Sequence, residues 1–176
     1  NFAVRFNHQF GVDFFPEPQA FDMTGKLVKV PGLDGSGKMG KSEAEGNAIF
    51  LRESETEIWN KVKKAKTDAG PTEPNQEKSP EIQNLFMLLE LVSSPQTVQH
   101  FEDTYNNCSI RYGDLKKQLS DDIAAFTKPL RERITELESN PAYINKIAQD
   151  GAEKARISAR ATLDGVQEIM GLKSIW

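Results

Sequence analysis

The chain has 176 residues, of which 38% are hydrophobic and 27% are charged, and its formal net charge at pH 7 is −4. This composition is ordinary for a globular protein, and no apolar run approaches the roughly 18 residues that a membrane span needs. The negative charge argues against a protein that binds nucleic acid through bulk charge. One cysteine and two histidines exclude an internal disulfide and a cysteine-rich metal site. We therefore expect a cytoplasmic protein with no membrane contact and no protein-bound metal.

The N-terminal segment predicts the end of a helix followed by short extended segments. Phe2, Phe6 and Phe10 recur every four residues, and Gly11 is a suitable helix stop. Because the chain begins within this pattern and not with Met, we expect a fragment of a longer protein. Residues 21–30, "FDMTGKLVKV", place a Thr-Gly pair between alternating runs and predict a small hairpin.

A glycine-rich polar loop is predicted for residues 31–46. Within it, "GSGKMGKS" at 35–42 matches the G-x-x-x-x-G-K-[ST] pattern of a P-loop. A P-loop also needs a buried strand before it, a helix that begins at its Lys-Ser pair and a later strand with a magnesium-binding Asp. Pro31 and Gly32 break the preceding strand, Gly46 interrupts the following helix, and the rest of the chain predicts helices. A P-loop nucleotidase and a solvated lysine loop without a ligand remain alternatives.

A mobile lysine loop is a different way to bind polyphosphate. Lys38 and Lys41 lie three residues apart among glycines, which let the loop move and let backbone N–H groups approach phosphate oxygens. As pyrophosphate leaves, negative charge accumulates on its oxygens. Lysine ammonium groups placed there stabilise the transition state more than the ground state. Ser42 can donate a further hydrogen bond.

Beyond residue 50 the sequence predicts helices almost throughout. Ser54 and Glu57 form an S-x-x-E capping box, and Ile58, Val62 and Ala65 give the helix that follows a buried stripe. Such a stripe predicts a helix packed against a core.

Three further helices are predicted before residue 140. Pro80 at a first helical position begins "EIQNLFMLLELV", which is apolar almost all round and is expected to be buried, and Pro95 begins the next helix. The longest pattern runs from Gly113 to Glu138, and Pro129 should kink it or split it in two. Its apolar face consists of Leu115, Leu119, Ile123, Phe126, Leu130, Ile134 and Leu137.

A last helix or helix pair is predicted for residues 141–170. Ala152, Ala155, Ala159 and Leu163 lie on one side of it. The residues by themselves therefore leave two broad possibilities: a helical protein with a phosphate-binding loop, or a helical interaction module in which the lysine loop is incidental.

Residues 38–42, "KMGKS", resemble the KMSKS loop of the class I aminoacyl-tRNA synthetases. Further segments occur in the order found in the C-terminal half of the bacterial tryptophanyl-tRNA synthetases, so the resemblance covers essentially the whole chain. These segments are "AVRFNHQFG", "FPEP", "GLDGSGKMGKSEAEGNAIFL", "KKAKTD", "NLFMLLELV" and "GAEKARISARATLDGVQEIMGL". The last of them favours the tryptophanyl over the tyrosyl enzymes, as does the lack of an appended RNA-binding domain.

The resemblance implies a mostly α fold. Residues 1–50 would be the C-terminal remnant, short strands and loops, of a Rossmann-type nucleotide-binding domain that carries the KMSKS-like loop. Residues 51–176 would be a helical bundle of the anticodon-binding type, whose closing helix packs back on the first part. The family forms tryptophanyl-adenylate from ATP, used with Mg²⁺, and transfers the amino acid to tRNA(Trp); the full-length enzymes are homodimers.

The resemblance also implies roles for the loop residues. Lys38 and Lys41 would be catalytic and contact the ATP phosphates, and Ser42 would assist through a hydrogen bond. Met39 would lie near the adenine edge, with a simple loop anchor in an apolar gap as the alternative. Gly40 stands where the family usually has Ser, so only a backbone N–H role survives at that position.

The helical part is expected to bind tRNA, because Lys and Arg commonly contact RNA backbones and aromatic rings stack on bases. The candidates are Arg111, Tyr112, Lys116, Lys117, Arg156 and Arg160. A solvated helix face is the alternative for each of them. The family's His-x-Gly-His signature and its tryptophan pocket belong to the other half, so we expect the isolated chain to be inactive.

Overall fold

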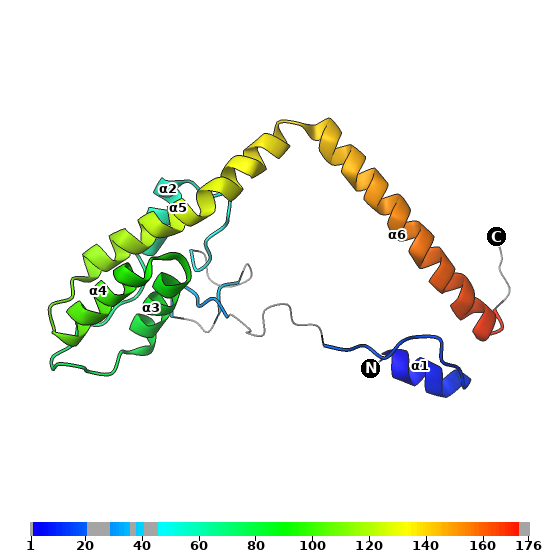
Figure 1. Ribbon diagram of the computed structural model, residues 1–176, viewed down its shortest axis with the longest axis horizontal. Coiled ribbons are helices and arrows are strands. Elements are labelled where there is room, and N and C mark those ends of the chain that lie inside the picture. The colour runs from blue at the N-terminus through cyan, green and yellow to red at the C-terminus, as the bar shows by residue number, and fades with distance from the viewer. Residues whose placement is uncertain (1, 21–28, 36–37, 41–45, 173–176) are drawn as a thin grey trace. The chain divides into compact units, whose positions relative to one another are not determined.

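A computed structural model describes residues 2–20, 29–35, 38–40 and 46–172. These ranges contain six helices and no strand (Figure 1): α1 (Phe2–Phe10), α2 (Glu55–Val62), α3 (Pro80–Val92), α4 (Pro95–Asn106), α5 (Tyr112–Glu138) and α6 (Pro141–Ile169). The predicted mostly α class is confirmed. Most of the predicted hairpin, residues 21–28, lies outside the described ranges, so the β remnant stays a prediction.

The chain forms two compact units. One combines Asn1–Leu27 with Leu137–Trp176, and the other is Val28–Glu136. These two units describe which residues pack together. They do not test the predicted domain boundary at residue 50, which stays a prediction. None of the helices in the described ranges has both the length and the apolar character needed to cross a membrane.

Helix α2 begins with the predicted capping box. The Ser54 hydroxyl oxygen accepts from the Glu57 N–H at 3.3 Å, and the Ser54 N–H donates to Glu57 Oε2 at 2.8 Å. The hydrogen bonds from Ser54 hold the pKa of the Glu57 carboxyl below its usual value. Two of the N–H groups that a helix start leaves unpaired are thus satisfied. The predicted stripe of Ile58, Val62 and Ala65 is buried.

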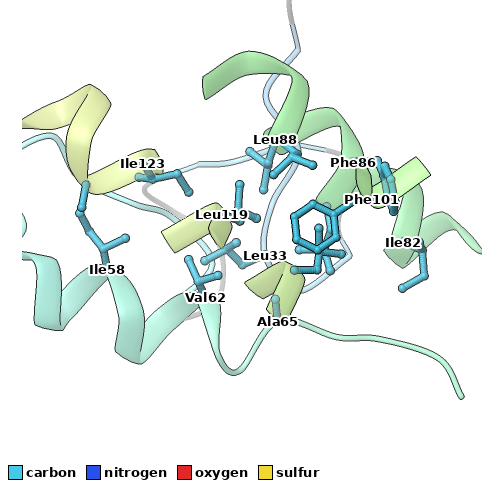
Figure 2. Packing of buried hydrophobic residues seen from close by; sticks show 14 of the residues in the cluster. Leu33, Ile58, Val62, Ala65, Ile82, Phe86, Leu88, Phe101, Leu119 and Ile123 are labelled. Atoms are coloured by element: carbon cyan, nitrogen blue, oxygen red, sulfur yellow. The ribbon is translucent and has the colours of Figure 1, made fainter. Parts of the chain in front are cut away.

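The core of the 28–136 unit lies where α2, α3, α4 and the first half of α5 meet (Figure 2). Tyr105 from α4 is fully buried, and its ring meets that of Phe86 from α3 edge to face at 6.0 Å. The prediction that α3 is buried is confirmed for most of its surface. Met87 and Leu91, however, are 48% and 41% exposed, so one narrow side of α3 faces outward.

Helix α5 is a single helix that continues through Pro129. Proline removes one backbone hydrogen bond but does not end this helix. Of the two predicted outcomes, the split is therefore wrong, and the kink stays a prediction. The predicted apolar face is buried from Leu115 to Ile123, whereas Phe126 and Leu130 are 56% and 42% exposed. The reason is that the core formed with α2–α4 covers only the N-terminal half of this long helix.

The other unit is built around aromatic contacts near the N-terminus. Phe6 contacts Phe2, Phe10, Phe14 and Phe15, with ring centroids 4.8–6.3 Å apart. Asn7 fixes the turn after α1, because its Oδ1 accepts from the Phe15 N–H at 3.0 Å and its Nδ2 donates to Phe15 O at 2.7 Å.

Glycines permit the turn after α1 and the contact with α6. Gly11 has φ +63°, which confirms it as the helix stop. On α6, a Cβ at Gly165 would lie 2.7 Å from the Phe14 ring, so a larger residue there would force this ring to move. No side chain in the helical span of α6 is buried.

The core predicts the effect of shortening a leucine on α5. We expect Leu119→Ala to lower the free energy of unfolding by about 2–5 kcal/mol, because the substitution leaves a cavity at a fully buried site. Leu130→Ala, on the exposed half of the same helix, should cost less than about 1 kcal/mol. Urea denaturation followed by circular dichroism measures both, and equal losses would contradict the described core.

Candidate functional site

The two ends of the glycine-rich loop are held together by Asn47. Its backbone oxygen accepts from the Leu33 N–H at 3.2 Å, and its side-chain Oδ1 accepts from the Asp34 N–H at 3.1 Å. Asn47 is only 1% exposed. One buried residue after the loop therefore fixes the backbone that leads into it, because buried hydrogen bonds are costly to break.

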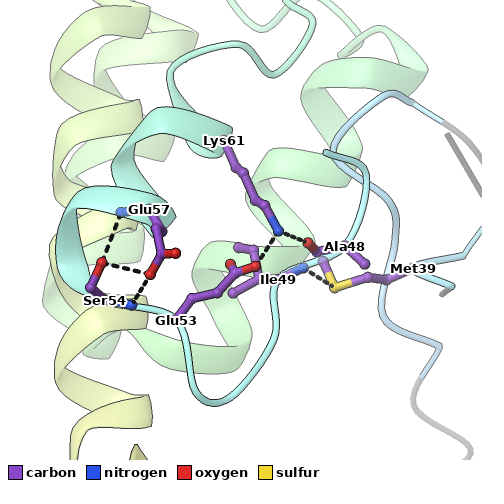
Figure 3. A network of polar contacts seen from close by, with 7 residues as sticks. All are labelled: Met39, Ala48, Ile49, Glu53, Ser54, Glu57 and Lys61. Carbon is purple, nitrogen blue, oxygen red and sulfur yellow. Dashed lines mark hydrogen bonds and ion pairs between the residues drawn. The ribbon is translucent and has the colours of Figure 1, made fainter. Parts of the chain in front are cut away.

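Met39 attaches the middle of the loop to the same base. Its N–H donates to Val30 O at 2.8 Å, and its Sδ accepts from the Ile49 N–H at 3.3 Å (Figure 3). The side chain also packs against the core. This is the loop anchor considered from the sequence, and a role for Met39 near adenine stays a prediction.

The other loop candidates are placed in part. Lys38 is exposed and directly precedes the anchored Met39, while Gly40 is half-buried. Lys41 and Ser42 lie outside the described residues, so their predicted phosphate contacts stay predictions. For Lys38 the structure gives an ammonium-bearing side chain at the protein surface, attached to a fixed point of the loop.

A polar network that the sequence analysis missed supports the exit from the loop (Figure 3). The Lys61 ammonium donates to Ala48 O at 2.7 Å and forms an ion pair with Glu53 Oε1. The Glu53 backbone oxygen accepts from Arg131 Nη1 at 2.9 Å. The partners come from three places along the chain, and no local sequence pattern predicts such contacts. The only signal in the sequence was a lysine in the last turn of α2.

Two hollows adjoin this loop base. One, of about 600 Å³, is lined by polar groups that include Asp34, Asn47, Lys61 and Lys64. The other, of about 570 Å³, is apolar, and Met39 and Gly40 lie in its wall. Its remaining lining residues are Val30, Ala48, Ile49, Phe50, Leu51, Leu88, Leu91, Val92, Ile123 and Phe126. The loop base thus borders one hollow that carries several charged and polar side chains and another that is mainly apolar.

The first group of candidate tRNA-binding residues has mixed surroundings. Tyr112 Oη donates to Asp68 Oδ1 at 2.6 Å, and Lys116 Nζ donates to Ala65 O at 2.7 Å, so both side chains join α5 to the segment after α2. Arg111 and Lys117 are exposed, and Lys117 pairs with a neighbouring acid one turn along α5. Arg111 and Lys117 therefore present charge to solvent, while Tyr112 and Lys116 make contacts within the fold.

The second candidate pair lies on α6. Arg156 and Arg160 are both exposed, one helical turn apart. Arg156 lies 3.5 Å from a Glu153 oxygen, and Arg160 lies 2.9 Å from an Asp164 oxygen. Such exposed pairs are weak and readily exchanged for other anions, so both guanidinium groups are available to a phosphate.

Asp68 collects hydrogen bonds that stabilise its charged form. Burial raises the pKa of this carboxyl, but hydrogen bonds from Tyr112, Ser79 and the Gly70 N–H outweigh it and hold the pKa below its usual value. The same contact acts oppositely on the phenol, since burial and the bond to Asp68 raise the pKa of Tyr112. Burial lowers the pKa of Lys116. Across the described ranges, no three His, Cys, Asp or Glu side chains gather closely enough to hold a metal ion.

Comparison with known proteins decides the family. The sequence model described as "tRNA synthetases class I (W and Y)" matches residues 1–128, which include the loop and most of the core. The chain belongs to this family. The predicted resemblance of the loop to a synthetase KMSKS segment therefore has the expected family context.

Relatives of this class I synthetase chain confirm the tryptophanyl branch. It is 55% identical over 172 residues to a tryptophan–tRNA ligase from Porphyromonas gingivalis, covering 98% of this chain and 52% of that protein. It is 38% identical to a tryptophan–tRNA ligase from Helicobacter pylori strain 26695, covering 98% and 51%. The chain thus spans about half the length of the curated relatives that it matches.

A solved structure agrees with the described fold. The tryptophanyl-tRNA synthetase of Campylobacter jejuni, complexed with ADP and tryptophan, superposes with a TM-score of 0.72 at 26% identity. The similarity covers 97% of this synthetase chain and 51% of the Campylobacter protein.

The Tyr112–Asp68 contact predicts a pH-dependent stability. We expect Tyr112→Phe to lower the free energy of unfolding by about 1 kcal/mol at pH 7, because a hydrogen bond to a carboxylate is lost. The folded-state pKa of Asp68 is depressed, so its stabilisation is complete above the unfolded value of about 4 and is lost as the pH falls through the folded value.

The difference between Tyr112→Phe and the natural chain should therefore shrink below about pH 4. Urea denaturation at several pH values measures it, with Tyr143→Phe on exposed α6 as the matched control. A loss of stability that does not vary with pH would contradict the role assigned to Asp68.

Proposed function

We propose that this chain is the part of a tryptophan–tRNA ligase that supplies the ATP-phosphate loop and the tRNA-binding helices. The observation that carries the proposal is the 55% identity to the Porphyromonas gingivalis ligase over 98% of this chain. The described loop base supports it, because Met39 is fixed while the adjacent Lys38 side chain is exposed.

The first step would form tryptophanyl-adenylate. A carboxylate oxygen of tryptophan attacks the α-phosphorus of ATP, a new P–O bond forms, and the bond to the bridging oxygen of pyrophosphate breaks. Mg²⁺ would enter bound to ATP and not to residues of this chain. Lys38 and Lys41 would neutralise the charge that develops on departing pyrophosphate, and Ser42 and the Gly40 N–H would donate to its oxygens.

The contacts that anchor Met39 would hold the adjacent Lys38 in position before ATP binds. An ammonium group on a wholly free segment would have to be ordered at each turnover, and ordering a side chain and its backbone opposes catalysis. The contacts of Met39 with Val30 and Ile49 keep one end of the KMGKS segment in place before ATP binds. The apolar hollow bordered by Met39 and Gly40 suits the flat face of a base, which supports placing adenine on this side.

The second step would transfer the tryptophanyl group to tRNA(Trp). The exposed charges of Arg111 just before α5, of Lys117 on α5, and of Arg156 and Arg160 on α6 are suited to its phosphates. We assign no RNA contact to Tyr112 or Lys116, because both side chains are engaged within the fold. As in the family, we propose a homodimer for the full-length enzyme.

The alternatives receive less support. A P-loop would be preceded by a strand and followed at once by a helix. The described residues on both sides of this loop, 29–35 and 46–54, form turns and irregular backbone. A purely helical interaction module would not need a loop base fixed by the hydrogen bonds of Asn47 and Met39.

The adenylate role predicts activity only when the other half of the enzyme is supplied. We expect the isolated chain to show no tryptophan-dependent ATP–pyrophosphate exchange. A chimera in which it replaces the matching 52% of the Porphyromonas gingivalis ligase should show exchange. In the chimera, Lys38→Ala should lower kcat/KM for ATP by about 10²–10³-fold, since a charge that stabilises the transition state is removed.

Lys63→Ala in the same chimera is the matched control, because Lys63 is an exposed lysine of the 28–136 unit outside the loop. An unaltered rate in Lys38→Ala, or exchange by the isolated chain, would contradict the proposed division of roles.

The tRNA role predicts weak binding by the chain alone. In a gel shift, tRNA(Trp) should bind more tightly than a non-cognate tRNA, and the affinity should fall as salt rises. The double variant Arg156→Ala with Arg160→Ala should weaken binding. The slope of the logarithm of the binding constant against the logarithm of the salt concentration should become shallower by about 1–2, because two phosphate contacts are lost. The pair Lys63→Ala and Lys66→Ala removes the same charge elsewhere, and equal weakening by both pairs would refute a specific role for α6.

A further inference from the structure

The ammonium group of Lys61 makes three contacts with residues 48–53, the segment at the exit of the phosphate loop (Figure 3). It donates to Ala48 O at 2.7 Å, forms an ion pair with Glu53 Oε1, and lies 4.8 Å from the centroid of the Phe50 ring. The side chain is 21% exposed, so most of it lies within the protein. A lysine has three N–H donors and no acceptor, and these contacts use the group from several sides. Lys61 is therefore fixed in one position.

Glu53 extends the connection to α5. Its backbone oxygen accepts from Arg131 Nη1 at 2.9 Å, and the same Nη1 lies 3.3 Å from Thr127 Oγ1. The contacts thus run from Ala48, beside the loop, through Lys61 and Glu53 to Arg131. Arg131 belongs to α5, the long helix that also carries Lys117 and begins directly after Arg111.

The burial of Glu53 makes this connection stiff. The residue is 9% exposed, and its second carboxylate oxygen, Oε2, has no hydrogen-bond partner among the described residues. A buried carboxylate needs a partner of opposite charge. Lys61 supplies that charge, and the same ammonium group that compensates Glu53 also holds Ala48.

We propose that Lys61 is a positioning residue for the phosphate loop, and that Glu53 and Arg131 couple the position of the loop to α5. The inference rests on the proposed function. Lys61 contacts no substrate; it acts through Ala48, which follows directly on Asn47, the residue that closes the loop base. A displacement of about 1 Å at that base would move Lys38 relative to the phosphates, which is enough to lower a rate by roughly 10²-fold.

The variant that tests the proposal combines Lys61→Met with Glu53→Gln. It removes the tie to Ala48 without leaving a lone buried charge, so the fold is retained. Lys61→Arg is the conservative variant, because a guanidinium can donate to the same oxygens. Lys63→Met is the matched control, since Lys63 lies on the surface two residues further along.

The first measurement is amide hydrogen exchange in the 176-residue chain itself. In the double variant, the amides of Leu33, Asp34 and Met39 should exchange at least about 10-fold faster, because loosening the loop exit exposes their hydrogen bonds. Amides in the middle of α3 should be unaffected. Lys61→Arg and Lys63→Met should resemble the natural chain, and unchanged exchange at the loop base in the double variant overturns the proposal.

The second measurement is ATP–pyrophosphate exchange in the Porphyromonas chimera, with rates expressed per active site so that unfolded enzyme does not contribute. The double variant should lose about 10-fold or more in kcat/KM for ATP, with KM for tryptophan unchanged, and Lys61→Arg should retain most of the activity. A change of less than twofold overturns the positioning role while the proposed function stands. If the chimera without any substitution shows no exchange, the proposed function is contradicted, and so is the positioning role that rests on it.

Discussion

The contact between the N-terminal half of α5 and helices α2–α4 is the constraint on which the 28–136 unit depends. Leu115 and Leu119 are fully buried there, together with Tyr105 from α4 and Leu89 from α3. Burial of such side chains is the main favourable term in folding. Because α2 is held in this core through Ile58 and Val62, Lys61 on the same helix has a fixed place from which to hold the loop exit.

Around that core, apolar and polar contacts have different tasks. Contacts between apolar side chains have no preferred direction, and they set the positions of the helices. The hydrogen bonds of Asn47, Met39 and Lys61 are directional, and they set the geometry of the loop base. Directional bonds are needed there because the proposed phosphate-binding role of Lys38 requires its position to be fixed to within a fraction of an ångström. Lys38 itself remains at the surface, where a ligand can reach it.

The family assignment and the exposed surfaces support each other. The chain spans about half of its tryptophan–tRNA ligase relatives. The exposed apolar residues near the loop, Phe50 and Leu51, line the apolar hollow proposed above for adenine. Tyr112 and Lys116 are residue types that commonly contact RNA. In this fold, however, each side chain donates a hydrogen bond to the segment that follows α2.

Several elements of this fold could be predicted from sequence alone because their causes are local. The capping box of Ser54 and Glu57, the helix start at Pro80, and the stop at Gly11 each depend on residues within one turn of each other. The KMGKS segment was likewise recognisable as a contiguous pattern. Pro129 was expected to kink α5 or split it in two, and the split is wrong, because α5 runs through Pro129 as one helix.

What the tertiary structure decided is which side chains meet across long separations. Arg131 bonds to Glu53 across 78 residues and Tyr112 to Asp68 across 44, and neither pair has a local sequence pattern. The sequence likewise predicted one continuous apolar face on α5, but the fold buries only the half that α2–α4 cover. Periodicity fixes which side of a helix is apolar, whereas burial depends on what other segments the folded chain brings against it.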